Sequence, residues 1–240
     1  MLNIKELIKI TTKNQTQPIN IYREYCQNLF LSYLYQENGS NYIQFKGGTA
    51  LRIYYNSPRY SEDLDFSIFM LNKKQVEDKI LNVIFNLEKT NLKPELEESK
   101  ETSGGYLANL TLLIDTYRVK IAIQASRRKT TYIQPNLVLI NNDFIPAYTM
   151  CLLNEKDLIT EKLEAAVTRS KPRDFFDIYF LLRKGSVGIE QRNLLKQTVN
   201  IVKKSKINFK RELEDFLPRN FHAVAADFPR LYSQEVSKYF

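Results

Sequence analysis

The most chemically informative residues are two aspartates, Asp63 and Asp65, in the segment Ser61-Glu62-Asp63-Leu64-Asp65-Phe66. Polar and apolar residues alternate from Asp63 to Phe69, which predicts a β-strand, and residues two apart on a strand point to the same face. Two carboxylates on one face repel each other unless a cation lies between them. Magnesium prefers hard oxygen ligands and commonly uses one or two carboxylates together with phosphate oxygens. The pair therefore predicts a Mg²⁺ site, with Mn²⁺ as the alternative ion, and Ser61 on the same face is a candidate phosphate ligand.

A glycine pair precedes the aspartates and predicts a phosphate loop. Gly47 and Gly48 stand between residues 42–46, which indicate a short strand, and residues 49–55, which indicate a short helix. Glycines let backbone N–H groups approach a phosphate closely, and a helix N-terminus adds partial positive charge. We expect Gly47, Gly48 and the hydroxyl of Thr49 to bind the phosphates of a nucleoside triphosphate (NTP).

Each half of this pattern also has a simpler interpretation. Glycine pairs often form only a turn, and an alternating strand often presents only charged residues to water. Either motif alone would favour that interpretation. Their occurrence together, in the order strand, glycine pair, helix, loop and strand, favours a site for a magnesium–nucleotide complex.

The composition excludes several other kinds of chemistry. The chain has two cysteines, Cys26 and Cys151, without C-x-x-C spacing, and one histidine, His222. We expect two reduced, buried thiols rather than a disulfide or a zinc site. A single histidine leaves little room for Ser-His or Cys-His catalysis, so the chemistry must use carboxylates, lysine or a metal. The net charge of +8 favours an anionic partner such as nucleic acid.

The elements that must position these residues follow from hydrophobic periodicity. We expect an α/β part that is followed by helices from Asn154 onward. Asn154 with Asp157 resembles a helix N-cap, and Pro172 can open a helix. The expected helices of the first part are residues 18–36, 49–55 and 73–87. The expected strands are residues 42–46, 63–69, 92–98 (at a sheet edge, because of Pro94), 106–114 paired with 118–124, and 131–140.

This pattern predicts an α/β (α+β) fold with two domains. We expect an α/β lobe with a mixed sheet over residues 1–148 and an all-helical lobe over residues 149–240, with the active site in the cleft between them. No apolar run approaches the roughly 18 residues that a membrane span needs. The N-terminal segment also lacks the apolar core of a signal peptide. We therefore expect a cytoplasmic protein with no membrane partner.

The glycine pair and the aspartates together resemble the first motif of the DNA-polymerase-β-like nucleotidyltransferases. A later segment narrows the resemblance, because it is similar to the E-K-L…A…R…R-D-x-x-D stretch of the AbiEii/AbiGii toxin branch, which includes the MenT-type toxins. The resemblance covers roughly residues 20–185. The later segment is Glu161-Lys162-Leu163-Glu164-Ala165-Ala166-Val167-Thr168-Arg169-Ser170-Lys171-Pro172-Arg173-Asp174-Phe175-Phe176-Asp177.

The resemblance implies two further site residues. The toxin branch has a lysine that contacts the triphosphate and an aspartate, after the arginine, that acts at the active site. The matching positions are Lys162 and Asp174. Judged without the family, Lys162 would be a solvated helix lysine and Asp174 a carboxylate favoured by a helix N-terminus.

The function implied by the resemblance is that of a toxin in a bacterial toxin–antitoxin system, with a role in abortive infection and phage defence. Such an enzyme transfers a nucleoside monophosphate from Mg–NTP to an acceptor hydroxyl, and the related toxins imply the 3′ end of tRNA. A cognate antitoxin is the implied protein partner. Two alternatives stay open: nucleotidylation of a protein or of a small molecule such as an aminoglycoside, and a non-catalytic nucleotide-binding protein.

Many polymerase-β-like enzymes have a third carboxylate on a neighbouring strand. The expected strand 118–124 alternates, with Val119, Ile121 and Ile123 toward the core. Its other face has no acidic residue, and Ala122 stands where a carboxylate would be expected. Because two metal ions need enough negative ligands to offset their repulsion, we expect one firmly held Mg²⁺.

Overall fold

The computed structural model describes residues 2–90, 92–129, 132–204 and 207–240. The chain forms two compact units. The first comprises Met1–Tyr55 and Tyr60–Leu153, and the second comprises Asn56–Arg59 and Asn154–Phe240. The chain therefore enters the second unit briefly at residues 56–59, returns to the first, and enters the second again at Asn154.

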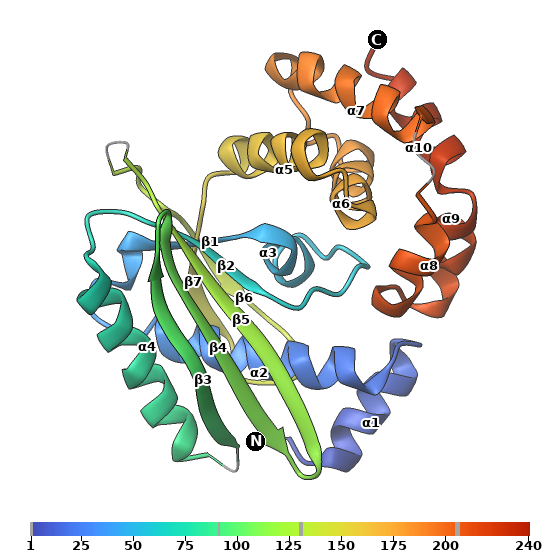
Figure 1. Cartoon of the computed structure of the whole chain (residues 1–240). Helices are drawn as coiled ribbons and strands as arrows, with labels where there is room; N and C mark the ends of the chain where they lie inside the picture. Colours follow the sequence, from blue (N-terminus) through green and yellow to red (C-terminus); the bar gives the residue numbers. More distant parts are fainter. Residues whose placement is uncertain (1, 91, 130–131, 205–206) are drawn as a thin grey trace. The chain divides into compact units, whose positions relative to one another are not determined.

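The first unit is built on a mixed seven-stranded sheet in the order β3-β4-β5-β2-β1-β7-β6 (Figure 1). The central strand β2 is antiparallel to β1 and parallel to β5. The mixed α/β sheet that we predicted is confirmed. The strands are β1 (Ile43–Lys46), β2 (Leu64–Ile68), β3 (Lys93–Thr102), β4 (Gly105–Ile114), β5 (Tyr117–Arg127), β6 (Asn136–Ile140) and β7 (Tyr148–Leu152).

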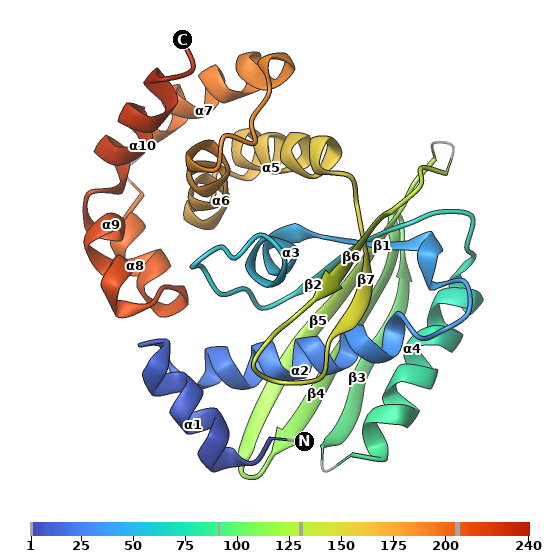
Figure 2. The ribbon, with the colours of Figure 1, turned by 180° about the vertical axis from the view of Figure 1, so that it is seen from behind.

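Two long helices cover one face of this sheet. Pro18 begins the longer helix at a position where its missing N–H costs little. Asn72 and Gln75 cap the other with reciprocal hydrogen bonds between side chain and backbone. Figure 2, which shows the molecule from behind, shows that the longer helix, α2 (Pro18–Leu34), lies across the sheet. The helices of this unit are α1 (Ile4–Lys13), α2 (Pro18–Leu34), the short α3 (Gly47–Ile53) and α4 (Lys73–Glu88).

The strands agree closely with the alternation in the sequence. Leu64, Phe66 and Ile68 are buried on the helix-covered face, as predicted. β4 and β5 form the expected hairpin, in which Asp115 adopts a φ of 54° in the turn. Pro94 lies in β3, which is an edge strand, also as predicted.

One strand was not predicted, and another is shorter than expected. β7 crosses the boundary that we predicted between residues 148 and 149, and it was missed because its run of apolar residues is short. The units divide after Leu153, so the whole of β7 lies in the first unit. β6 begins at Asn136 rather than at Thr131, and Thr131 lies outside the described residues.

The second unit is helical. Asn154 accepts a hydrogen bond from the backbone N–H of Asp157 and so caps its first helix, as predicted. Ser170 ends that helix with a φ of 53°, and Pro172 opens the next one. Aromatic rings, among them Phe175, Phe228 and Tyr232, pack in its core. The helices are α5 (Glu155–Arg169), α6 (Pro172–Arg183), α7 (Arg192–Lys204), α8 (Phe209–Leu213), α9 (His222–Ala226) and α10 (Phe228–Ser237).

Two expectations concern the chain as a whole. Cys26 and Cys151 are free and buried, as predicted. Among the described residues, no helix has both the length and the apolar character needed to cross a bilayer.

Candidate active site

The two aspartates lie at the start of β2. Asp63 immediately precedes the strand, and Asp65 is its second residue. The neighbouring strands bring Lys46 of β1 and Gln124 of β5 into register with Asp65. Since residues in register point to the same face, the row Lys46–Asp65–Gln124 lies on the face opposite the buried Leu64. The predicted face is therefore confirmed for Asp65, whereas Asp63 precedes the strand and has no register partner in it.

Gly47 lies directly against Asp65. Its φ of 83° is in the left-handed region that favours glycine, and a Cβ atom added there would lie 2.2 Å from Oδ2 of Asp65. No side chain fits between the glycine loop and the carboxylate. The loop and the carboxylate, which are separated by 17 intervening residues in the sequence, are therefore in direct contact.

Thr49 positions the aspartate segment. Its side chain is 0% exposed, and its hydroxyl donates a 2.5 Å hydrogen bond to the carbonyl oxygen of Asp63. We had expected this hydroxyl to bind phosphate, but the structure gives it a backbone partner within the first unit. Thr49 thus connects the first turn of α3 to the residue before β2.

Polar residues of α2 hold the same segment, and this role was not predicted. Gln27, which is buried, donates hydrogen bonds of 3.1 Å to the carbonyl oxygens of both Ser61 and Glu62. The side chain of Ser61 is half-buried beside this contact. The signal in the sequence is a polar stripe at helical spacing on a helix that is otherwise apolar. Its members are Asn20, Glu24, Gln27 and Asn28, all buried.

Arg52 is also fixed by α2. Its guanidinium pairs with Glu24 at 2.8 Å and lies 4.0 Å from the ring centre of Tyr60. Burial lowers the pKa of Arg52, but the charge of Glu24 outweighs burial and raises it above its usual value. Arg52 therefore holds α3 against α2 and the segment that leads to β2.

The beginning of β2 is the candidate place for a magnesium ion, and it offers few carboxylate ligands. Asp63 and Asp65 would provide carboxylate oxygens, and Gly47 lies directly against Asp65. Among the described residues, no group of three His, Cys, Asp or Glu side chains could hold a metal ion. Val119, Ile121 and Ile123 are buried, so the predicted alternation of β5 is confirmed, but the residue beside Asp65 is Gln124 rather than Ala122. The donor set suits one ion whose remaining ligands are phosphate oxygens or water.

The two residues implied by the resemblance belong to the second unit. Lys162, on α5, donates a hydrogen bond to Oδ2 of Asp177 at 2.8 Å, and its side chain is 11% exposed. Asp174, in the first turn of α6, is 3% exposed and accepts a 3.0 Å bond from Arg169 at Oδ1. Within the described part of the chain, Oδ2 of Asp174 is buried without a hydrogen-bond partner. Lys162 is therefore not the solvated helix lysine of the family-free interpretation, whereas Asp174 does lie in the first turn of a helix, as that interpretation gave it.

Asp177 is the centre of a buried ion cluster in the same unit. Its two oxygens accept hydrogen bonds of 2.8 and 2.9 Å from Nε and Nη2 of Arg59. Burial raises the pKa of Asp177, but the charges of Arg59 and Lys162 outweigh burial and hold it below its usual value. The carboxylate is therefore ionised at neutral pH. The sequence placed Asp177 in a motif but gave no sign of its partner Arg59.

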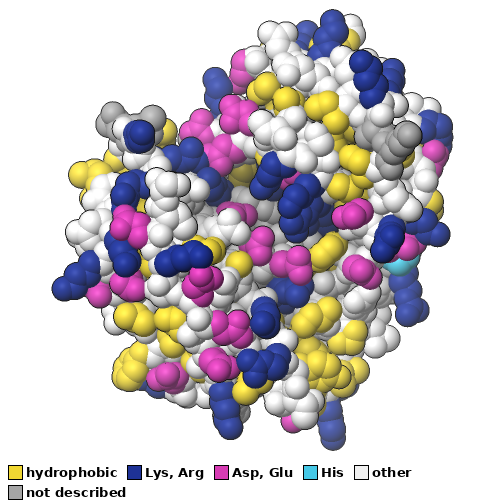
Figure 3. Space-filling model, in the orientation of Figure 1, with side chains coloured by type: hydrophobic (Ala, Val, Ile, Leu, Met, Phe, Trp, Pro, Cys, Tyr) yellow, Lys and Arg dark blue, Asp and Glu magenta, His cyan; other side chains and the backbone are white. Residues whose placement is uncertain are grey.

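The face of the molecule formed by β3, β4 and β5 carries no single basic patch. Figure 3 shows Lys and Arg side chains interspersed with Asp and Glu on this face. Several of these side chains form ion pairs, in which a carboxylate neutralises a positive charge. These pairs are Arg118–Glu95, Lys120–Glu97 and Arg127–Glu101, at 3.0, 3.4 and 3.1 Å.

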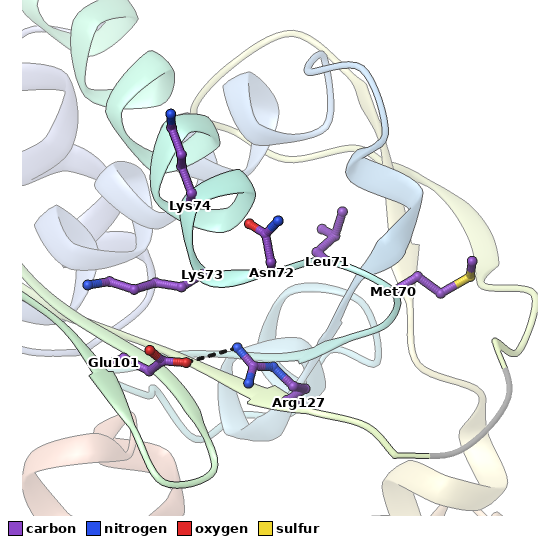
Figure 4. A pocket seen from close by; sticks show the side chains of 7 residues that line it. All are labelled: Met70, Leu71, Asn72, Lys73, Lys74, Glu101 and Arg127. Carbon is purple, nitrogen blue, oxygen red and sulfur yellow. Dashed lines mark hydrogen bonds and ion pairs between the residues drawn. The ribbon is translucent and has the colours of Figure 1, made fainter.

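A hollow of about 680 Å³ lies elsewhere in the first unit, beside the N-terminus of α4 (Figure 4). It is lined by residues 70–74 with Glu101 and Arg127. Met70 follows the end of β2, whereas Asp65 lies at its beginning. None of the predicted site residues lines this hollow, so it is separate from the candidate active site.

A comparison with protein families identifies the class of protein as a nucleotidyltransferase. The model of the family described as "Nucleotidyl transferase AbiEii toxin, Type IV TA system" matches residues 29–235. The chain belongs to this family of nucleotidyltransferase toxins from type IV toxin–antitoxin systems, as the resemblance predicted. Membership implies an NTP substrate, a divalent metal and a cognate antitoxin.

Solved structures share the fold at low sequence identity. JHP933 from Helicobacter pylori has a TM-score of 0.64 and 18% identity, over 93% of this chain and 94% of that chain. MenT4, a nucleotidyltransferase toxin from Mycobacterium tuberculosis H37Rv, has a TM-score of 0.59 and 16% identity, over 92% of this chain and 87% of that chain. No curated protein sequence matches the chain significantly.

Proposed function

We propose that the chain transfers a nucleoside monophosphate from an NTP to an acceptor hydroxyl and releases pyrophosphate. The observation that supports this proposal is the contact of Gly47 with Asp65, which brings the glycine loop against a carboxylate of the D-x-D motif. Asp63 and Asp65 would hold one Mg²⁺ or Mn²⁺ ion. When bound, that ion would neutralise charge on the phosphates and orient the reacting oxygens.

The chain's own residues bind and orient the nucleotide in this proposal. The backbone N–H groups of Gly47, Gly48 and Thr49 face the phosphates, and Ser61 adds a hydroxyl donor. The Thr49 hydroxyl and Gln27 fix the carbonyls of the aspartate segment instead. Lys162 contributes a positive charge to the triphosphate.

Asp174 is the proposed acceptor of a proton. In the transfer, the acceptor hydroxyl oxygen forms a bond to the α-phosphorus, the bond to the β-phosphate bridging oxygen breaks, and the hydroxyl proton must leave. A buried Oδ2 without a donor suits this task, because it has a lone pair that is not already engaged. Arg169 donates a hydrogen bond to the other oxygen and so holds the carboxylate in place.

For the acceptor we propose the 3′ end of tRNA, on the strength of the family and the net charge of +8. The cognate antitoxin would oppose the effect of this transfer in the cytoplasm, and phage defence would be its setting. The mixed charges of the β3–β5 face add no separate support.

The decisive experiment incubates the purified chain with each labelled NTP and total RNA, and then separates RNA, protein and small molecules. Label in the RNA fraction supports the proposal, whereas label in protein or in a small molecule would identify a different acceptor. Asp63→Asn and Asp65→Asn should each abolish transfer, while Asp78→Asn on α4 serves as the matched control. Full transfer by a folded Asp65→Asn protein would refute the metal site.

A further inference from the structure

The exposed side of α7 carries only basic and amide side chains, and we call it the basic face. Three of its exposed residues are Asn or Gln, and none is acidic or apolar. The exposed side of α4, by contrast, includes acidic and apolar residues such as Asp78 and Phe85. The four cations of the basic face are Arg192, Lys196, Lys203 and Lys204.

The cations of the basic face are not neutralised by carboxylates of the chain. Within the residues that the structure describes, none of the four takes part in an ion pair. The sequence has no acidic residue between Glu190 and Glu212, and Glu190 pairs with Lys156 at 3.4 Å. Every Lys and Arg of β5, by contrast, pairs with a glutamate. The positive charge of the basic face is therefore left for a partner outside the chain.

The stability of the helix accounts for only part of this charge. Lys203 and Lys204 lie in the last turn of α7, where cations interact favourably with the helix dipole. Arg192 lies in the first turn, where the dipole disfavours a cation, and α7 has no acidic residue there to offset it. A solvated charge run that stabilises the helix thus explains one end of the basic face and not the other.

The geometry of the basic face fits an extended polyanion. At the usual α-helical pitch, Arg192, Lys196 and Lys203 lie within about 40° of one another around the axis and span about 16 Å along it. Such a row can face several successive phosphates, because a nucleic-acid strand carries one negative charge every few ångströms. The amides lie on the same exposed side, and amide side chains are common hydrogen-bond donors to phosphate and sugar oxygens.

The opposite side of α7 is buried, which argues against a membrane as the partner. Leu195, Thr198 and Val202 are buried, and the Thr198 hydroxyl lies 2.5 Å from the hydroxyl of Tyr232 on α10. α7 packs against α5 and α10 within the second unit (Figure 1). A helix that binds a membrane surface needs an exposed apolar side. Ile189, which precedes the helix, is exposed, but a single apolar side chain does not form one.

We infer that the basic face of α7 binds the sugar–phosphate backbone of RNA, independently of the RNA sequence. This inference rests on the proposed function, since RNA is the acceptor proposed there, and it assigns a binding surface in the second unit to that acceptor. The basic face takes no part in the chemical step. It needs neither a nucleotide nor a metal ion to bind RNA.

Titration of fluorescently labelled bulk tRNA with the purified chain, without NTP and at several salt concentrations, tests the inference. Arg192→Gln, Lys196→Gln and Lys203→Gln, combined in one α7 variant, should raise Kd by roughly tenfold or more. The slope of log K against log salt should become shallower by about 2 to 3, because each lost phosphate contact removes about 0.7 to 0.9. The melting curve should stay unchanged, since the three side chains are exposed and glutamine suits a helix.

Two controls separate a local contact from net charge. Lys5→Gln, Lys9→Gln and Lys74→Gln, combined in one chain, remove the same charge from exposed positions on α1 and α4 and should change Kd and slope little. Arg192→Lys, Lys196→Arg and Lys203→Arg keep every charge of the row and should keep the affinity for tRNA.

Equal slopes for the α7 variant and the charge-matched control would overturn the inference. An α7 variant that loses affinity for polyglutamate but keeps its affinity for tRNA would assign the basic face to an acidic protein instead. In the transfer assay, the α7 variant should raise KM for tRNA and leave kcat nearly unchanged. Binding of tRNA that depends on α7, without any transfer of label to RNA, would refute the proposed acceptor and not the inference. Transfer to RNA with the same KM in all variants would refute only the inference.

Discussion

Gly47 and Asp65 are in such close contact that the glycine has no room for a Cβ atom. The left-handed φ of Gly47 turns the backbone against the carboxylate at the point where β1 ends and α3 begins. Two separate constraints therefore favour glycine at this position: the left-handed backbone conformation and the lack of room for a Cβ atom.

The first prediction separates these two reasons. Gly47→Ala should lose transfer activity by at least roughly a hundredfold, because displacement of a reacting group by about 1 Å costs that much. Gly39→Ala is the matched control, since Gly39 has a φ of 74° and its added Cβ would meet no atom closer than 3.7 Å. Both variants should lose about 1–2 kcal/mol from backbone strain. Melting curves and transfer assays on the pair would contradict this reasoning if Gly47→Ala stayed as active as the control.

The second prediction concerns the hydroxyl of Thr49. Thr49→Val keeps the shape and removes the bond to the Asp63 carbonyl, which should cost about 1–3 kcal/mol of unfolding free energy. Activity should also fall, because the aspartate loses its support. Thr49→Ser keeps the hydroxyl and should restore most activity, as measured by urea denaturation beside a transfer assay. Equal activity of the valine and serine variants would show that the hydroxyl does not position Asp63.

The third prediction concerns the number of metal ions. In the wild-type chain we expect one Mn²⁺ for each bound nucleotide, counted by electron paramagnetic resonance. Gln124→Glu would add a carboxylate beside Asp65 and should increase the affinity for a further ion. Gln36→Glu, at an exposed position on the same unit, is the control. Two tightly held ions in the wild type would show that two carboxylates and the nucleotide suffice.

The fourth prediction uses the buried thiols. Burial raises the pKa of Cys151 to about 11, and it raises the pKa of Cys26 as well. Both thiols should resist a thiol reagent at pH 8 in the native state and react after unfolding. A raised pKa means that the protonated thiol contributes stability below its unfolded pKa, which is lost as pH rises through about 11. The difference in melting temperature between wild type and Cys151→Ala should accordingly shrink over that range, and a constant difference would contradict the assignment.

Local patterns made much of the fold predictable. The alternation around Asp65, the hairpin turn at Asp115 and the edge strand with Pro94 each depend on neighbours in sequence. β7 was missed because its short apolar run, Tyr148–Leu152, shows neither alternation nor helical spacing.

The site was predictable to the same extent. The spacing of the carboxylates and glycines is visible in the sequence, whereas the residues that contact them in the folded chain are not. Arg59 and Asp177 are separated by 118 positions, and nothing in either local sequence indicates the other. The hydroxyl of Thr49 also has a partner that only the folded chain reveals, because a hydroxyl can serve a phosphate or a carbonyl equally well.

Residues 56–59 belong to the helical unit, and this limits how the chain could be divided into its two units. No single cut separates the two units, since the helical unit contains four residues from within the first half of the chain. A fragment that starts at Asn154 would keep Asp177 and Lys162 but lose Arg59, and one that ends at Leu153 would keep Arg59 without its carboxylate. Recombination between distant relatives at this boundary would join an arginine and an aspartate that had not evolved together. Division of the chain at this boundary therefore separates the buried pair of Arg59 and Asp177.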